Sequence, residues 1–219
     1  MCGIVGYVGN KACQKIILGS LERLEYRGYD SSGIATIYHD KLQSRRAVGK
    51  LSELKIKIKK MPVLGSLGIG HIRWATHGGV TEENAHPHLA NGEVAIVHNG
   101  IIENYAELKK ELIEKGFLFI SETDSEVLAH LFAHAFKEVL EPVEALRLVL
   151  SKIEGAFAFA AISKSNPETL LVARNASPLV IGFTDKMAIV ASDATAIAHL
   201  TRQVTYLKDN DYAVIKAQS

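Results

Sequence analysis

Apolar positions along the first part of the chain follow two spacings, one typical of short buried strands and one typical of amphipathic helices. Residues 4–8 form an apolar run between glycines and predict a strand. Residues 11–26 follow with apolar positions three and four apart, which predicts a helix. Residues 33–38 and 42–48 predict two strands joined at His39-Asp40, which indicates a hairpin.

The middle of the chain contains a long polar segment between two apolar runs. A lysine-rich helix is expected up to Met61-Pro62, and residues 69–74 predict the next strand. Residues 75–92 are rich in Thr, Gly, Asn, His and Pro and predict a loop. A loop of this length within one domain is uncommon and is often functional. Residues 93–98 predict a strand that ends at Asn99-Gly100.

Three helices and then a series of closely spaced strands are expected after this point. One helix stops at Gly116, the next has Asp124 at its start as a cap, and Pro142 begins the third. Six short apolar runs follow, at residues 156–162, 169–173, 179–183, 188–191, 204–207 and 212–215. Strands so close together favour antiparallel pairing, because parallel pairing needs long crossovers. With no linker, low-complexity stretch or repeat, the sequence predicts one α+β domain over residues 1–219.

Composition and charge exclude several classes of protein. Of the 219 residues 47% are apolar, and 25 Lys and Arg balance 24 Asp and Glu. This balance disfavours nucleic acid and anionic membranes as partners, because both usually attract a basic excess. With two cysteines and no signal segment, we expect no disulfide framework, no cofactor and a cytoplasmic protein.

Cys2 occupies the position that becomes the N-terminus if Met1 is removed. A free α-amine would then lie beside the thiol and could accept its proton at neutral pH. One residue would supply both nucleophile and base, as N-terminal threonine nucleophiles do. The alternative is that Cys2 is a small packed side chain at the start of a strand, as Cys13 is expected to be within its helix.

Three further positions could complete a site for acyl transfer. Asn99 and Gly100 could direct a side-chain amide and a backbone N–H at one oxyanion, although Asn-Gly is also a common turn. Arg73 ends a strand at the long loop and could bind a carboxylate. Asp124 could bind an ammonium group or act only as a helix cap.

Histidines gather at His71, His77, His86, His88 and His98, which raises the question of a metal site. No His-Glu-x-x-His motif or paired-cysteine spacing accompanies them. The sequence therefore favours a site without metal.

Seven segments together resemble one known family. They are MCGIVGYVG, LEYRGYDSSGIA, GIGHIRWATHG, NAHPH, VHNGIIENY, SETDSEVLAHL and RNASPLVIG, in this order. In this they resemble the glutaminase (class II glutamine amidotransferase) domain of the glucosamine-6-phosphate synthases, over essentially the whole chain. The resemblance implies the N-terminal-nucleophile hydrolase fold, with two antiparallel β-sheets sandwiched between α-helical layers. It also implies release of ammonia from the side-chain amide of L-glutamine.

The resemblance further implies a role for each matching residue. Cys2 is then the nucleophile, and Asn99 and Gly100 form the oxyanion hole. Arg73 resembles the residue that binds the α-carboxylate of glutamine, and Asp124 the one that binds its α-ammonium. The remaining implied residues are Thr76 and His77 as aids to carboxylate binding, Trp74 in a loop that closes over glutamine, and Arg27 as a support of the site.

The family's chains continue into two sugar-phosphate isomerase domains that use the ammonia to make glucosamine-6-phosphate from fructose-6-phosphate. This chain stops at Ser219, so we expect an isolated glutaminase domain whose natural partners are those domains in cis. A second hypothesis is a module that binds glutamine without hydrolysing it. Such a sensor would need Arg73 and Asp124 but would have no use for Cys2.

Overall fold

Two antiparallel β-sheets, stacked face to face, form the centre of the molecule in a computed structural model that describes residues 2–75 and 78–217. One sheet has seven strands in the order β11-β9-β10-β1-β4-β2-β3, and the other has five in the order β12-β8-β7-β6-β5. The first sheet comprises β1 (Gly3–Gly9), β2 (Ser31–Tyr38), β3 (Lys41–Val48), β4 (Leu67–Arg73), β9 (Val180–Thr184), β10 (Met187–Ala191) and β11 (Val204–Tyr206). The second comprises β5 (His88–Ala90), β6 (Val94–Ile102), β7 (Gly155–Ser163), β8 (Asn166–Asn175) and β12 (Tyr212–Lys216).

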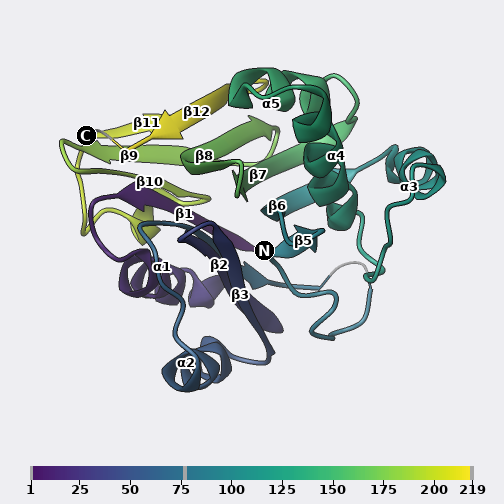
Figure 1. Cartoon of the computed structure of the whole chain (residues 1–219). Coiled ribbons are helices and arrows are strands. Elements are labelled where there is room, and N and C mark those ends of the chain that lie inside the picture. Colours follow the sequence, from purple (N-terminus) through teal and green to yellow (C-terminus); the bar gives the residue numbers. More distant parts are fainter. Residues whose placement is uncertain (1, 76–77, 218–219) are drawn as a thin grey trace.

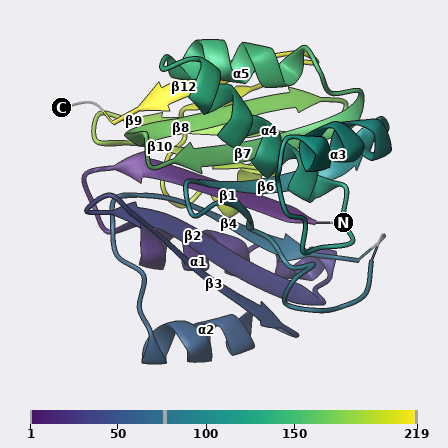
Figure 2. The ribbon, with the colours of Figure 1, turned by 45° about the vertical axis from the view of Figure 1, so that its right-hand side comes forward.

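Helices cover the outer face of each sheet (Figure 2). The seven-stranded sheet is covered by α1 (Cys13–Glu22) and α2 (Leu51–Lys60), and the five-stranded sheet by α4 (Ser125–Glu138) and α5 (Pro142–Leu150), with α3 (Tyr105–Glu114) packed against α4. Two short 3-10 turns, η1 (Glu25–Arg27) and η2 (Ala194–Ala196), complete the described elements. The expected α+β architecture, with two antiparallel sheets between helical layers, is confirmed.

Apolar side chains form one core between the sheets and one beneath each helical layer. The core between the sheets contains many small residues, among them Ala95, Ala158 and Ala160. Small side chains allow the two sheets to approach closely, because the size of the side chains between two facing sheets sets the distance between the sheets. This close approach matters for the groups that lie between the sheets.

Several predicted elements have different bounds in the structure. The first helix covers only Cys13–Glu22, and η1 follows it as a separate turn. The long loop is interrupted by β5, which pairs with β6. The strand expected to end at residue 98 continues to Ile102, because β7 pairs with it along this whole length.

The hairpin at His39-Asp40 is confirmed, with both residues at positive φ as the favoured two-residue turn requires. Among the described residues, no helix combines the length and the apolar character needed to cross a bilayer.

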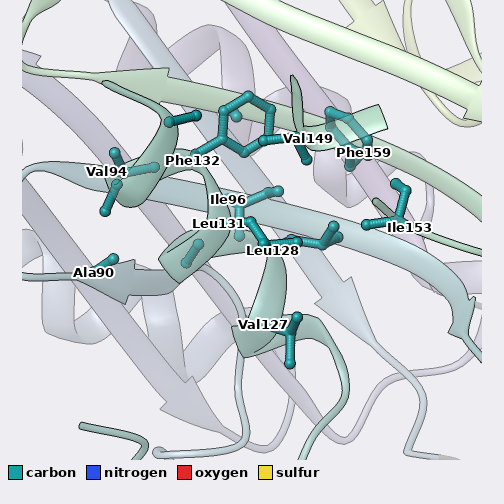
Figure 3. Close-up of a cluster of buried hydrophobic side chains, with 14 of the residues drawn as sticks. Ala90, Val94, Ile96, Val127, Leu128, Leu131, Phe132, Val149, Ile153 and Phe159 are labelled. Carbon is teal, nitrogen blue, oxygen red and sulfur yellow. The ribbon is translucent and has the colours of Figure 1, made fainter. Parts of the chain in front are cut away.

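Phe132 provides a test of the core beneath α4 (Figure 3). Its ring is fully buried and packs edge-on against Phe159, with ring centroids 5.6 Å apart. Removing the ring leaves a cavity, so Phe132→Ala should lower the free energy of unfolding by about 3–5 kcal/mol in urea denaturation. Leu118→Ala is the control, because Leu118 is 83% exposed and its loss should change stability by about 0.5 kcal/mol at most. Equal effects of the two changes would contradict this packing.

Candidate functional site

A cavity of about 470 Å³ opens where the start of β1, the end of β4 and the middle of β6 meet the segment before α4. Most of the residues that the sequence singled out line this one cavity. The lining residues are Cys2, Arg73, Trp74, His86, His98, Asn99, Gly100, Ile101, Thr123, Asp124 and Ser125. Segments far apart in the chain therefore converge on a single site.

The Cys2 thiol lies just before the start of β1. Its Sγ accepts a hydrogen bond from the backbone N–H of Trp74 at 3.2 Å and lies 3.4 Å from the carbonyl of the same residue. Burial raises the pKa of the Cys2 thiol; the Trp74 N–H opposes this rise, and the nearby Asp30 carboxylate adds to it. The thiol is therefore predominantly protonated at neutral pH.

The backbone that follows Cys2 makes hydrogen bonds to Ser192 in addition to those of the sheet. The Ile4 N–H donates to the Ser192 hydroxyl at 3.1 Å, and the Ser192 N–H donates to the Ile4 carbonyl at 3.1 Å. Both partners are buried. These bonds fix the chain two residues after the thiol.

Asn99 and Gly100 lie within β6, so the turn interpretation of Asn-Gly is wrong. Asn99 Nδ2 lies 3.4 Å from the Cys2 carbonyl oxygen, and Asn99 Oδ1 lies 2.9 Å from His71 Nε2. Gly100 has φ +125°, and a Cβ there would lie 1.9 Å from the Ala156 carbonyl oxygen. Only glycine fits this position, because a side chain there would clash with the backbone of β7.

The Arg73 guanidinium is 4% exposed and borders the cavity at the end of β4. It donates to the carbonyls of Gly79 at 3.0 Å and Gly78 at 3.4 Å, and it lies 4.0 Å from the Asp30 carboxylate. Asp30 in turn accepts a hydrogen bond from the Ala75 N–H. Arg73 thus joins the end of β4 to the loop at Gly78 and Gly79.

Asp124 does not cap α4, so the cap interpretation is wrong. Its side chain makes no hydrogen bond to the first turn of the helix. Instead, Asp124 Oδ2 accepts the N–H of Ile102 at 2.7 Å, which joins the segment before α4 to the end of β6. Asp124 also lines the cavity.

Glu126 holds the loop that carries Asp124. It is buried and accepts the N–H groups of Ile120 and Ser121 and the hydroxyl of Ser121, at 2.7–3.2 Å. Burial alone would raise the pKa of Glu126, but these donors and His130 lower it to about 2. Sequence patterns did not single out Glu126, because a glutamate in the first turn of a helix is common and gives no sign of burial.

Buried histidines form a layer beside the cavity. The rings of His71 and His86 have centroids 4.1 Å apart, and those of His86 and His88 4.5 Å apart. Burial lowers the pKa of His71 and of His88 to about 3 and that of His98 to about 4, so all three are neutral at pH 7. Within residues 2–75 and 78–217, no three His, Cys, Asp or Glu side chains are grouped to hold a metal ion.

The remaining predicted residues lie elsewhere. Trp74 borders the cavity and is half-exposed, whereas Arg27 lies outside it and contacts the Asp193 carboxylate and the Tyr26 hydroxyl. Met1, Thr76 and His77 fall outside the described residues. Five lining residues were not predicted from the sequence, although each is adjacent to a predicted residue or lies within one of the same motifs: His86, His98, Ile101, Thr123 and Ser125.

The raised pKa of Cys2 predicts how fast iodoacetamide alkylates it. Thiolate is the attacking form, so the rate should rise about tenfold per pH unit from pH 7 to 9, with no plateau below pH 9. Cys13 is fully buried with its pKa raised to about 12, so mass spectrometry should find the label on Cys2 alone. The Cys2→Ala protein is the control and should take up no label. A plateau below pH 8 would contradict the effect of burial.

Known proteins resemble this chain in both sequence and fold. The family model described as "Glutamine amidotransferase domain" matches residues 71–199. The glutamine–fructose-6-phosphate aminotransferase (isomerizing) of Mesorhizobium japonicum is 52% identical over all 219 residues, which cover 36% of its length. The enzyme of the same name from Caldanaerobacter subterraneus subsp. tengcongensis is 48% identical, again over the whole chain and 36% of the relative. The chain thus spans about a third of the length of these relatives.

A solved structure is similar over almost the whole chain. It is the glutamine phosphoribosylpyrophosphate amidotransferase from B. subtilis complexed with ADP and GMP. It is 28% identical with a TM-score of 0.77, and the match covers 98% of this chain and 49% of that one. The predicted N-terminal-nucleophile hydrolase fold is confirmed by this likeness and by the two stacked sheets. The matched span and the shared fold show that the chain belongs to the glutamine amidotransferase domain family.

Proposed function

We propose that this chain hydrolyses the side-chain amide of L-glutamine to glutamate and ammonia through a γ-glutamyl thioester on Cys2. The observation that carries the proposal is the convergence of a half-buried thiol and the Asn99 amide on one cavity, with Asn99 Nδ2 3.4 Å from the carbonyl of Cys2. A module that only binds glutamine needs no thiol beside an amide donor. The convergence therefore favours an enzyme over a sensor.

The proposed reaction begins when Cys2 Sγ attacks the amide carbon of glutamine. The carbonyl oxygen becomes an oxyanion, which accepts hydrogen bonds from Asn99 Nδ2 and the Gly100 N–H. Because burial keeps the thiol protonated, a base must take its proton as the S–C bond forms. The α-amine of Cys2, present once Met1 is removed, is the proposed base and returns the proton to the departing ammonia. Water then cleaves the thioester and releases glutamate.

The two ends of the substrate are proposed to bind at opposite charges. The Arg73 guanidinium would bind the α-carboxylate, with Thr76 and His77 as aids, and Asp124 would bind the α-ammonium. Both Arg73 and Asp124 border the cavity that contains Cys2, which supports the assignment. Trp74 and the residues up to Gly79 would close over the bound substrate, and Arg27 would support the site from outside.

The names of the relatives indicate an acceptor for the ammonia. Glutamine–fructose-6-phosphate aminotransferases transfer nitrogen to fructose-6-phosphate, and this chain matches 36% of their length. We propose that in the complete protein, sugar-phosphate isomerase domains in cis receive the ammonia and make glucosamine-6-phosphate, in cytoplasmic amino-sugar biosynthesis. Residues 1–219 would act as one glutaminase domain.

Asn99→Ala tests the oxyanion assignment. Loss of one oxyanion donor should lower kcat for glutamine hydrolysis about 100- to 1000-fold, with KM little changed, because the bond forms only as the oxyanion develops. Ammonia release is the measurement. Asn10→Ala is the control, since Asn10 is an exposed asparagine near the other end of β1. Near-normal turnover by Asn99→Ala would remove Asn99 from the mechanism.

Asp124→Asn tests the ammonium assignment, because the amide oxygen can still accept the Ile102 N–H. A charge-assisted hydrogen bond contributes about 1.5–3 kcal/mol, so kcat/KM for glutamine should fall roughly ten- to hundredfold. The comparison substrate is 4-carbamoylbutanoate, which lacks the α-amine. Its kcat/KM should be nearly equal in the two proteins. A parallel fall for both substrates would show that Asp124 acts on the fold and not on the ammonium.

A further inference from the structure

His71 lies on β4 of the seven-stranded sheet, and its ring reaches across to Asn99 on β6 of the five-stranded sheet. The His71 Nε2 and Asn99 Oδ1 atoms are 2.9 Å apart. His71 is fully buried and is not among the residues that line the cavity. It therefore contacts the oxyanion-hole amide from behind and cannot touch a substrate.

The chemistry of this contact determines where the hydrogen atom lies. An amide oxygen only accepts, so His71 Nε2 must carry the proton. Burial lowers the pKa of His71 to about 3, and the bond to Asn99 only partly opposes this, so the ring is neutral. A neutral imidazole donates from one nitrogen alone, which makes the Nε2–H form the one that fits Asn99.

The same bond selects between the two orientations of the Asn99 amide. With Oδ1 bound to His71, Nδ2 points towards Cys2 and can donate to an oxyanion. If the amide were rotated by half a turn, Oδ1 would face the developing negative charge, and Nδ2 could bond Nε2 only if the ring proton moved to Nδ1. Nδ1 is buried and has no hydrogen-bond partner among the described residues, which disfavours a proton there. The 3.4 Å contact of Nδ2 with the Cys2 carbonyl is long and holds the amide weakly by comparison.

The His71 ring is itself held in place by packing. His86 lies against it with ring centroids 4.1 Å apart and planes inclined by 35°. The bond thus comes from a group whose position is set by β4 and by the neighbouring His86 ring. This rigidity is what an oxyanion donor needs, because a displacement near 1 Å can cost about a hundredfold in rate.

We infer that His71 is a positioning residue that orients the Asn99 amide for the oxyanion, an inference that rests on the proposed glutaminase function. It acts through Asn99, and the proton on Nε2 stays on the ring throughout. Removing the donor should lower kcat while leaving glutamine binding and the thiol itself intact.

A matched pair of variants separates the hydrogen bond from packing. The amide nitrogen of His71→Gln falls near the position of Nε2 and can still donate to Asn99, whereas that of His71→Asn falls near Nδ1 and cannot. His71→Asn, and His71→Leu where it folds, should lower kcat about ten- to hundredfold with KM within about twofold. His71→Gln should recover most of the activity.

Two further measurements distinguish positioning from general damage. Alkylation of Cys2 by iodoacetamide forms no oxyanion, so its rate should be the same in all variants. A γ-aldehyde analogue of glutamate adds the thiol to its carbonyl and places the resulting oxygen in the oxyanion hole. Its affinity should fall in His71→Asn in proportion to kcat.

A double variant completes the test. In the Asn99→Ala background, His71→Asn should cause little further loss, because the amide that it orients is gone. Multiplicative losses, equal activity of the Gln and Asn variants, or slower alkylation in His71→Asn would overturn the inference and leave the proposed function standing. Near-normal activity of Asn99→Ala alone would instead remove Asn99 from the mechanism and with it the role proposed for His71.

Discussion

Hydrogen bonding along both edges of β1 holds the first residues of the chain in the middle of a sheet. Gly3 pairs with Ile72 on one side and Val5 with Ala191 on the other, and Ser192 adds bonds to Ile4. Chain ends usually fray, because few contacts hold them. Here Cys2 directly precedes a central strand, so backbone pairing of the next residues holds the start of the chain at the site.

The second half of the site comes from the other sheet, so its geometry depends on how the sheets stack. Alanines at positions such as 95, 158 and 160 fill the space between them, and β6 passes close to the start of β1. The His71–Asn99 contact crosses this space at 2.9 Å. A larger side chain in the core between the sheets would therefore act on the chemistry by separating thiol, amide and imidazole.

Local patterns predicted the elements well, and they failed where a contact across the fold decides the outcome. The hairpin at His39-Asp40 follows from alternation and turn residues alone. Asn99-Gly100 reads as a turn by itself, yet pairing with β7 extends the strand through it. Asp124 has the sequence position of a cap, yet its carboxylate bonds Ile102. Such pairings join residues that are distant in sequence, so no local pattern reveals them. The seven ordered motifs did identify these residues, because together the motifs are typical of one whole fold.

Burial favours the uncharged form of the Cys2 thiol and of three histidines near it. It raises the pKa of Cys2 and lowers those of His71, His88 and His98, so all four are uncharged at pH 7. These histidines supply no cation to a resting thiolate, and the Arg73 guanidinium opposes the rise in the pKa of Cys2 without overcoming the effect of burial. Negative charge therefore develops as the sulfur attacks, at the oxygen that faces Asn99 and Gly100. Donors that strengthen their bonds only at that moment lower the barrier without stabilising the ground state, and this differential binding is what accelerates a reaction.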